Sequence, residues 1–233
     1  MKWSELFTSS VGKKLVMALT GLFLITFLIV HAGINACIWA DVVVDDNGEM
    51  FNKAAHFMGS TVLIRIMEVG LFAGLLLHIV QGFMLEFKNR STRKSKYAVN
   101  YGNTGSKWYS RSMGLLGTLL LLFLVLHISH FWVPSRITHD MSEVWLSNGV
   151  VTHNLYQKMI DVFQSPWVVA VYVLGCISLA WHLLHGFQSA FRTLGVSNSR
   201  YIALINAAGV GFSIIVPLAF AMMPISMHFG WVN

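Results

Sequence analysis

Long apolar stretches separated by short polar segments dominate the pattern of this chain. A helix of about 20 apolar residues crosses the core of a bilayer. Five windows meet that requirement, at roughly 14–39, 60–86, 112–133, 166–191 and 201–228. Ser165 and Pro166 are a typical N-cap and first-turn proline for the fourth window, and Pro134 follows the third. The pattern predicts an all-α integral membrane protein with five transmembrane helices in a single domain over residues 1–233.

The composition supports the same class. Hydrophobic residues make up 55% of the chain and charged residues 11%, and the mean hydropathy is +0.63, which is too apolar for a soluble domain of this length. The two cysteines, Cys37 and Cys176, fall in different windows and form no CxxC motif, so neither a disulfide framework nor a redox dithiol is expected. No nucleic-acid partner is expected.

The distribution of Lys and Arg predicts the orientation. With the N-terminus in the cytoplasm, all of the sixteen basic residues except Lys53, Arg65, Arg136 and Lys158 lie on the cytoplasmic side. The positive-inside rule therefore favours an N-terminus inside and a C-terminus outside. The basic run from Lys88 to Arg111, which also carries Tyr97, Tyr101, Trp108 and Tyr109, is either a simple topology signal or a docking surface for cytoplasmic subunits.

Four of the windows carry histidine, which is costly inside a bilayer and marks a candidate site. The first and second windows carry one each, and the third and fourth carry doublets: His31, His78, His127 with His130, and His182 with His185.

The position of each histidine along its helix predicts its depth. His31 and His127 lie about 25 Å from the cytoplasmic ends of their helices. The second and fourth helices run in the opposite direction, and His78 and His185 lie only about 10–15 Å from their cytoplasmic ends. The imidazoles are therefore expected in two layers: an outer pair from the first and third helices, and an inner pair from the second and fourth.

Two layers are incompatible with a single four-histidine metal cluster. Two bis-histidine sites stacked across the bilayer fit the pattern, and the cofactor that takes two axial imidazoles from facing helices is haem b. Because the chain has no CxxCH motif, both haems would be held non-covalently, by a bundle formed from the first four helices. A transporter or a purely structural anchor, with histidines that only pack, predicts no haem.

Small and polar residues near these histidines extend the candidate site. Gln188 and Arg192 share one face of the fourth helix with His185, and Arg192 is placed to meet a haem propionate. Gly21 and Gly117 each stand ten residues before a histidine, about 15 Å toward the cytoplasm and level with the inner haem. A glycine there lets a macrocycle approach the backbone, although membrane helices also use glycine for packing.

Polar residues also occur near the outer layer. Arg65 and Glu68 are three apart on the second helix, so an internal ion pair is one interpretation. Glu68 lies about 15 Å outward from His78, level with the outer haem, and is predicted to handle protons near a quinone. His130, one turn beyond His127, faces either the edge of the outer haem or that quinone.

Three segments are similar to a known family: "TGLFLITFLIVH" in the first helix, "GTLLLLFLVLH" in the third and "HGFQSAFR" in the fourth. They resemble the Gly-to-His spacing and the His-Gly-x4-aromatic-Arg pattern of the di-haem cytochrome b anchors of succinate:quinone oxidoreductases, which include bacterial succinate dehydrogenases and quinol:fumarate reductases. The resemblance covers nearly the whole chain. It implies that His31 and His127 bind the outer haem, and that His78 and His185 bind the inner haem.

The resemblance also implies partners and a location. The chain would anchor a flavoprotein subunit, which holds FAD and performs the dicarboxylate chemistry, and an iron-sulfur subunit to the bacterial cytoplasmic membrane. It would carry electrons between the iron-sulfur clusters and a quinone, most commonly menaquinone, through two b haems. A cytochrome b anchor of a hydrogenase or formate dehydrogenase is the alternative. Cytochrome b of the bc complexes is disfavoured, since no window carries two histidines 13–14 residues apart.

Overall fold

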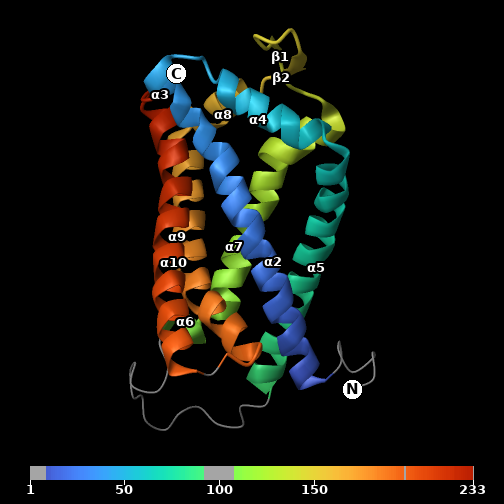
Figure 1. Cartoon of the computed structure of the whole chain (residues 1–233), viewed down its shortest axis with the longest axis vertical. Coiled ribbons are helices and arrows are strands. Elements are labelled where there is room, and N and C mark those ends of the chain that lie inside the picture. Colours follow the sequence, from blue (N-terminus) through green and yellow to red (C-terminus); the bar gives the residue numbers. More distant parts are fainter. Residues whose placement is uncertain (1–8, 92–107, 197, 233) are drawn as a thin grey trace.

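Five long helices run between two ends of the molecule (Figure 1). The computed structural model describes residues 9–91, 108–196 and 198–232. The long helices are α2 (Ser10–Ala36), α5 (Val62–Ser91), α7 (Met113–His127), α9 (Pro166–Thr193) and α10 (Ser199–His228). Further helical turns continue α2 to Val44 and α7 to Thr138. With these turns included, all five helices are long and apolar enough to cross a membrane, so the predicted all-α fold with five spanning helices is confirmed.

Four of these helices enclose the centre of the molecule. α2 packs against α5, α5 against α7, α7 against α9, and α9 against α2, which closes a four-helix bundle. α10 packs outside this ring, mainly along α9 and also against α2. Large apolar side chains on the outward faces are exposed, as expected of helices whose surroundings are lipid.

Short elements cover one end of the bundle, here called the hairpin end (Figure 1). They are η1 (Cys37–Trp39), α3 (Ala40–Val44), α4 (Glu49–Ser60), the antiparallel strands β1 (Glu143–Trp145) and β2 (Val151–His153), and α8 (Leu155–Phe163). The opposite end, called the α6 end, carries the single turn of α6 (Trp108–Arg111). The basic run from Lys88 to Arg111, interpreted either as a topology signal or as a docking surface, lies mostly outside the described residues, in 92–107.

The third spanning helix does not stop before Pro134. After α7 the chain continues in two π-helical segments, η2 (Ile128–Trp132) and η3 (Pro134–Thr138), so this span reaches Thr138. Pro134 is buried inside this continuous helix, where it has no N–H to donate to the preceding turn. The residues after His127 therefore stay helical but follow a wider turn.

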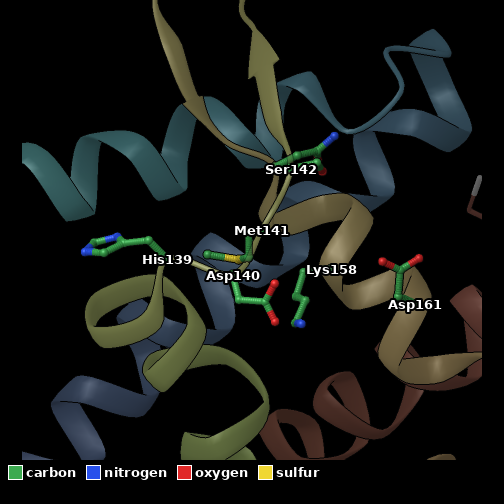
Figure 2. A pocket seen from close by; sticks show the side chains of 7 residues that line it. His139, Asp140, Met141, Ser142, Lys158 and Asp161 are labelled. Carbon is green, nitrogen blue, oxygen red and sulfur yellow. The ribbon is translucent and has the colours of Figure 1, made fainter.

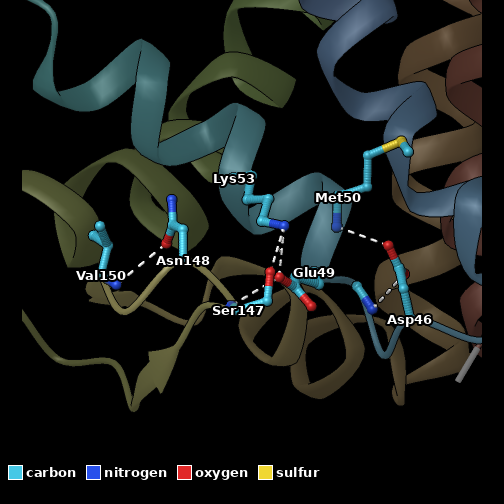
Figure 3. Close-up of polar contacts among 8 residues, drawn as sticks. Asp46, Glu49, Met50, Lys53, Ser147, Asn148 and Val150 are labelled. Atoms are coloured by element: carbon cyan, nitrogen blue, oxygen red, sulfur yellow. Dashed lines mark hydrogen bonds and ion pairs between the residues drawn. The ribbon is translucent and has the colours of Figure 1, made fainter.

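Hydrogen bonds fasten the hairpin to α4 (Figure 3). The Glu49 carboxylate accepts the Ser147 backbone N–H at 2.9 Å and pairs with Lys53 at 2.7 Å, while Lys53 donates to the Ser147 hydroxyl at 2.8 Å. The hydrogen bonds from Lys53 and Ser147 lower the pKa of Glu49 to about 2. Asp46 accepts the Met50 N–H at 2.8 Å and so caps the start of α4.

A buried apolar cluster lies beneath this cover. It includes Phe51, Tyr156, Phe163 and Tyr172, drawn from α4, α8 and α9. Tyr156 donates its hydroxyl to Asp41 at 3.1 Å, and burial together with that carboxylate raises the pKa of the phenol. Gly48, with a φ of +72°, lies directly against the Tyr156 ring, where any side chain would collide with it. The hairpin end is thus tightly packed.

Candidate functional site

Two histidines from different helices meet inside the bundle near the hairpin end. His31 lies in the last two turns of α2, and His127 is the last residue of α7. Their ring centroids are 5.8 Å apart and the ring planes are almost perpendicular. Two imidazoles bound on opposite sides of one metal ion, with bonds of about 2.0 Å, have centroids roughly 6 Å apart. The pair therefore has the separation of two axial ligands.

Aromatic rings surround this hairpin-end pair. Phe27 stacks on His31 with centroids 5.1 Å apart, and Phe220 of α10 lies 5.5 Å from the same ring. Phe123 and Phe131 flank His127 at 5.6 and 5.5 Å. Asn35 Nδ2 lies 3.3 Å from His31 Nδ1. Apart from this contact the imidazoles are packed among apolar rings, in a part of the bundle that favours a flat apolar ligand.

A second histidine pair lies nearer the α6 end. The His78 ring of α5 has its centroid 6.2 Å from that of His182 on α9, at an angle of 66°. We predicted His185 as the partner of His78, but the structure brings His182 to this position, and within the described residues no ring contact joins His78 to His185. The two candidates are one turn apart on one helix, a difference that depth along the sequence does not resolve.

Thr20 fixes the orientation of His78. Its hydroxyl donates to the Val16 carbonyl at 2.7 Å and lies 3.1 Å from His78 Nδ1. Because the hydroxyl proton is already used, the hydroxyl oxygen accepts a proton from Nδ1–H of His78. The other ring nitrogen, Nε2, then carries the free lone pair that a metal needs.

Gly21 and Gly117, the two glycines singled out in the sequence, lie next to the second pair. A Cβ built on Gly21 would lie 3.5 Å from His78 Cε1, and one on Gly117 would lie 3.9 Å from His182 Cε1. Each glycine stands ten residues from a histidine of the first pair, His31 or His127, which corresponds to about 15 Å of helix. Two helices thus give the same separation between the two histidine levels.

The available donor atoms fit haem. Within the described part of the chain no three His, Cys, Asp or Glu side chains gather into a metal site, so each pair offers an ion only two ligands. A porphyrin supplies the remaining four. His127 Nδ1 and His182 Nδ1 are buried and make no hydrogen bond, and such orphaned polar atoms call for a partner.

The predicted propionate residues lie on the same helix, toward the α6 end. Gln188 is partly buried and Arg192 is exposed in the last turn of α9, beyond both histidines of that helix. Both residues therefore lie between the second pair and the α6 end, where they are placed to contact an anionic group such as a propionate.

Glu68 is fixed by three neighbours near the hairpin end. Its carboxylate accepts the Trp132 Nε1–H at 2.5 Å and pairs with Arg65 at 3.1 Å and with Arg136 at 3.5 Å. The Arg65 pair was an expected alternative, whereas Trp132 and Arg136 were not anticipated. Trp132 lies in η2 and Arg136 in η3, and both reach Glu68 of α5 from these π-helical turns.

His130 makes a single defined contact with α9. Its Nδ1 lies 3.0 Å from the hydroxyl of Tyr172, and the two rings are stacked with centroids 5.9 Å apart. Tyr172 is buried and its ring also lies 6.0 Å from that of His127. His130 is thus joined to the first pair through Tyr172.

The fold and these pairs define a class: a multi-span helical membrane protein with two buried histidine pairs at separate levels. The chain is similar to the succinate dehydrogenase cytochrome b558 subunit of Bacillus subtilis (strain 168), with 25% identity across 67% of this chain and 72% of that protein. No family model matches the chain, and no solved structure matches it. The similarity supports a succinate dehydrogenase cytochrome b membrane subunit.

Proposed function

We propose that this chain is the membrane anchor and electron-transfer subunit of a succinate dehydrogenase or fumarate reductase complex. It carries electrons between an iron-sulfur subunit and a membrane quinone through two b haems. The quinone that the family resemblance implies is menaquinone. The observation that carries the proposal is the presence of two histidine pairs about 15 Å apart along the bundle. The relative's name supplies the class of complex.

Each pair has a distinct part in this proposal. His31 and His127 hold the outer haem, and His78 and His182 hold the inner one. When bound, the haems supply one-electron redox chemistry, and the protein's part is to fix the ligands and set their surroundings. Thr20 orients His78, Gly21 and Gly117 leave space beside the inner pair, and Gln188 with Arg192 lies toward the inner haem's propionates.

The quinone is proposed to bind at the hairpin end, near Glu68 and His130. Glu68 is joined to Arg65, Arg136 and Trp132 there, and His130 reaches the outer pair through Tyr172. A Glu68→Gln variant should weaken quinone affinity or turnover, since it removes the carboxylate charge from this group. Unchanged affinity and turnover would rule out this role for Glu68.

The partners are proposed to lie at the α6 end. With the N-terminus in the cytoplasm of a bacterial cell, this end faces the cytoplasm, and the inner haem lies nearer to it. An iron-sulfur subunit docked there would deliver electrons to the inner haem first, and a flavoprotein subunit with FAD would sit beyond it. The C-terminal end of α10 would then face outward.

Haem content tests the proposal directly. The purified complex should show a b-type α band on reduction with dithionite, and pyridine haemochrome assay should give two haems per chain. The absence of that band would exclude the haem function, and one haem per chain would exclude the two pairs. Co-purified hydrogenase or formate dehydrogenase subunits would favour the alternative class of cytochrome b anchor.

A pair of variants separates the two histidines of α9. His182→Ala should lower the content to one haem per chain, because His182 is the imidazole beside His78. His185→Ala should keep two haems, although it lies one turn away on the same helix. The reverse result would return the ligand role to His185, as the sequence resemblance implied.

A further inference from the structure

Two further histidines meet outside the membrane-spanning segments. His139 follows η3 directly, and His153 ends β2 at the base of the hairpin. His139 Nδ1 lies 3.4 Å from His153 Nε2, and the ring centroids are 5.5 Å apart. These two residues are called the hairpin histidine pair. Neither takes part in the electron-transfer function proposed above.

Backbone bonds fix the pair in place. The Met141 N–H donates to the His139 carbonyl at 3.1 Å, and the Asn154 N–H donates to the Ser142 carbonyl at 2.8 Å. His139 itself adopts a left-handed conformation, with φ of +52°, which is uncommon outside glycine and is held by this turn. The chain segments that carry the two rings are therefore ordered before any ligand arrives, which lowers the entropy cost of binding one.

The separation of the two nitrogens suits a chelated metal ion. Zinc binds imidazole nitrogen at about 2.0–2.1 Å, and two such ligands at a tetrahedral ion lie about 3.3–3.4 Å apart. The observed 3.4 Å falls at this value, and the two rings, which are stacked at 25°, would turn so that both lone pairs point to the ion. In the absence of metal the same two nitrogens share one proton in a hydrogen bond, so a bound ion takes the place of that proton.

A carboxylate is available as a third ligand. Glu143 is directly opposite His153 in the β1–β2 ladder, so the two side chains project from the same face with Cβ atoms about 5 Å apart. Glu143 is exposed. Among the described residues no three His, Cys, Asp or Glu side chains are already gathered, so binding would require this carboxylate to turn toward the pair. Imidazole and carboxylate together are a common donor set for zinc.

The surroundings are polar and open to water. His139 lies at the edge of a pocket of about 340 Å³, whose other lining residues are Asp140, Met141, Ser142, Asn154, Lys158 and Asp161 (Figure 2). His139 is exposed and His153 is partly buried, so a hydrated cation reaches the His139 ring first. Water can complete its coordination shell.

We propose that His139, His153 and Glu143 form a binding site for a divalent transition-metal ion such as Zn²⁺ at the hairpin end. The site is independent of the haem pairs, which lie within the spanning helices. A bound ion would cross-link the end of η3 to the base of the hairpin, and so tighten the cover of the bundle.

Calorimetric titration of the tag-free complex in detergent with ZnCl2 tests this site. One site with micromolar affinity is expected, and both His139→Ala and His153→Ala should weaken it at least tenfold. Glu143→Gln should weaken it several-fold. His228→Ala is the matched control, because His228 also lies near this end but its Nδ1–H donates to the Phe163 carbonyl, and it should leave the affinity unchanged.

A second measurement reports the ligands themselves. X-ray absorption at the zinc edge should show two imidazole nitrogens in the wild-type complex, and one in each histidine variant. Haem content, measured in parallel, should stay the same in all variants and shows that they are folded. Absence of saturable zinc binding below 1 mM, or equal affinity in wild type and both histidine variants, would overturn the proposal, whatever the haem measurements show.

Discussion

The two histidine pairs within the bundle, His31 with His127 and His78 with His182, lie in different surroundings. At the hairpin end His31 and His127 are packed among phenylalanine rings, and the covering elements close over them. Toward the α6 end His78 is oriented by a hydroxyl, and both imidazoles face glycine. Each pair therefore has one imidazole with a polar neighbour, Asn35 at His31 and Thr20 at His78, but the first pair is otherwise packed by phenylalanine rings and the second faces glycine. Two haems with identical axial ligands are expected to differ in potential for this reason.

The largest effect should follow from removing one ligand of the packed pair. His31→Ala leaves His127 as the sole imidazole at that level, so haem content should fall from two to one per chain while the inner haem keeps its spectrum. Pyridine haemochrome assay and redox titration measure this. His56→Ala, at a histidine that contacts Thr152 on the hairpin, serves as control and should keep both haems. Loss of both haems in His31→Ala, with the fold intact, would contradict two independent sites.

A smaller effect is expected from filling the open space of the other pair. Gly21→Leu adds a branched side chain where even a Cβ would stand 3.5 Å from His78, so the inner haem should be lost or its spectrum broadened. Gly33→Leu is the matched control on the same helix, because nothing lies within 4 Å of its Cβ position. Equal haem content in both variants would mean that Gly21 only packs.

The hydrogen bond at His78 should have a measurable but modest effect. Thr20→Val removes the acceptor for Nδ1–H and makes the imidazole a weaker donor to iron, which destabilises the oxidised form. The potential of the inner haem should rise by about 40 mV, which corresponds to a hydrogen bond of about 1 kcal/mol. Potentiometric titration measures the shift. An unchanged inner potential, or a shift confined to the outer haem, would contradict the assignment of Thr20 to the inner site.

The smallest effect concerns the cover of the hairpin end and depends on pH. The pKa of Glu49 is lowered to about 2, so its contribution to stability is complete above its ordinary value of 4.5 and is lost as pH falls through about 2. Glu49→Gln should therefore lower the protection factor of the Ser147 amide at pH 7, while in wild type this protection factor falls only in acid. Glu86→Gln, which affects a pair with Arg90 on α5, should leave Ser147 unchanged. If the Ser147 amide stayed equally protected in Glu49→Gln, the hydrogen bonds of the β1–β2 ladder would be sufficient to order the hairpin without Glu49.

The apolar windows made the five helices predictable, because a bilayer imposes length and composition directly. Helical rise also placed His31 with His127, since each is far from the basic end of its helix. The partner of His78 could not be predicted in the same way. His182 and His185 differ by one turn, and which of them faces α5 depends on how α9 is rotated against its neighbours, a tertiary property.

Contacts between side chains of different helices could not be predicted from the sequence either. Trp132 and Arg136 meet Glu68 only because the chain adopts π-helical turns, for which the sequence carries no local signal beyond a proline within an apolar span. Thr20 was the one sequence signal for such a contact, because its hydroxyl stands beside Gly21, where space for the haem was predicted, and there it can hydrogen-bond a ligand such as His78. The approach of His139 to His153 needed the strand register of the hairpin.

The π-helical turns after α7 also have a consequence for mutation. In η2 the Val133 N–H donates to the carbonyl of Ile128, five residues back, so this stretch holds more residues per turn than an α-helix. Deleting one residue from η2 would let that segment relax to ordinary α-helical winding, and the residues beyond it would keep nearly the same faces, because a π turn holds about one residue more than an α turn. His127 and Arg136 would both keep their directions. The same deletion within α7 would instead turn everything beyond it by about 100° and separate Arg136 from Glu68.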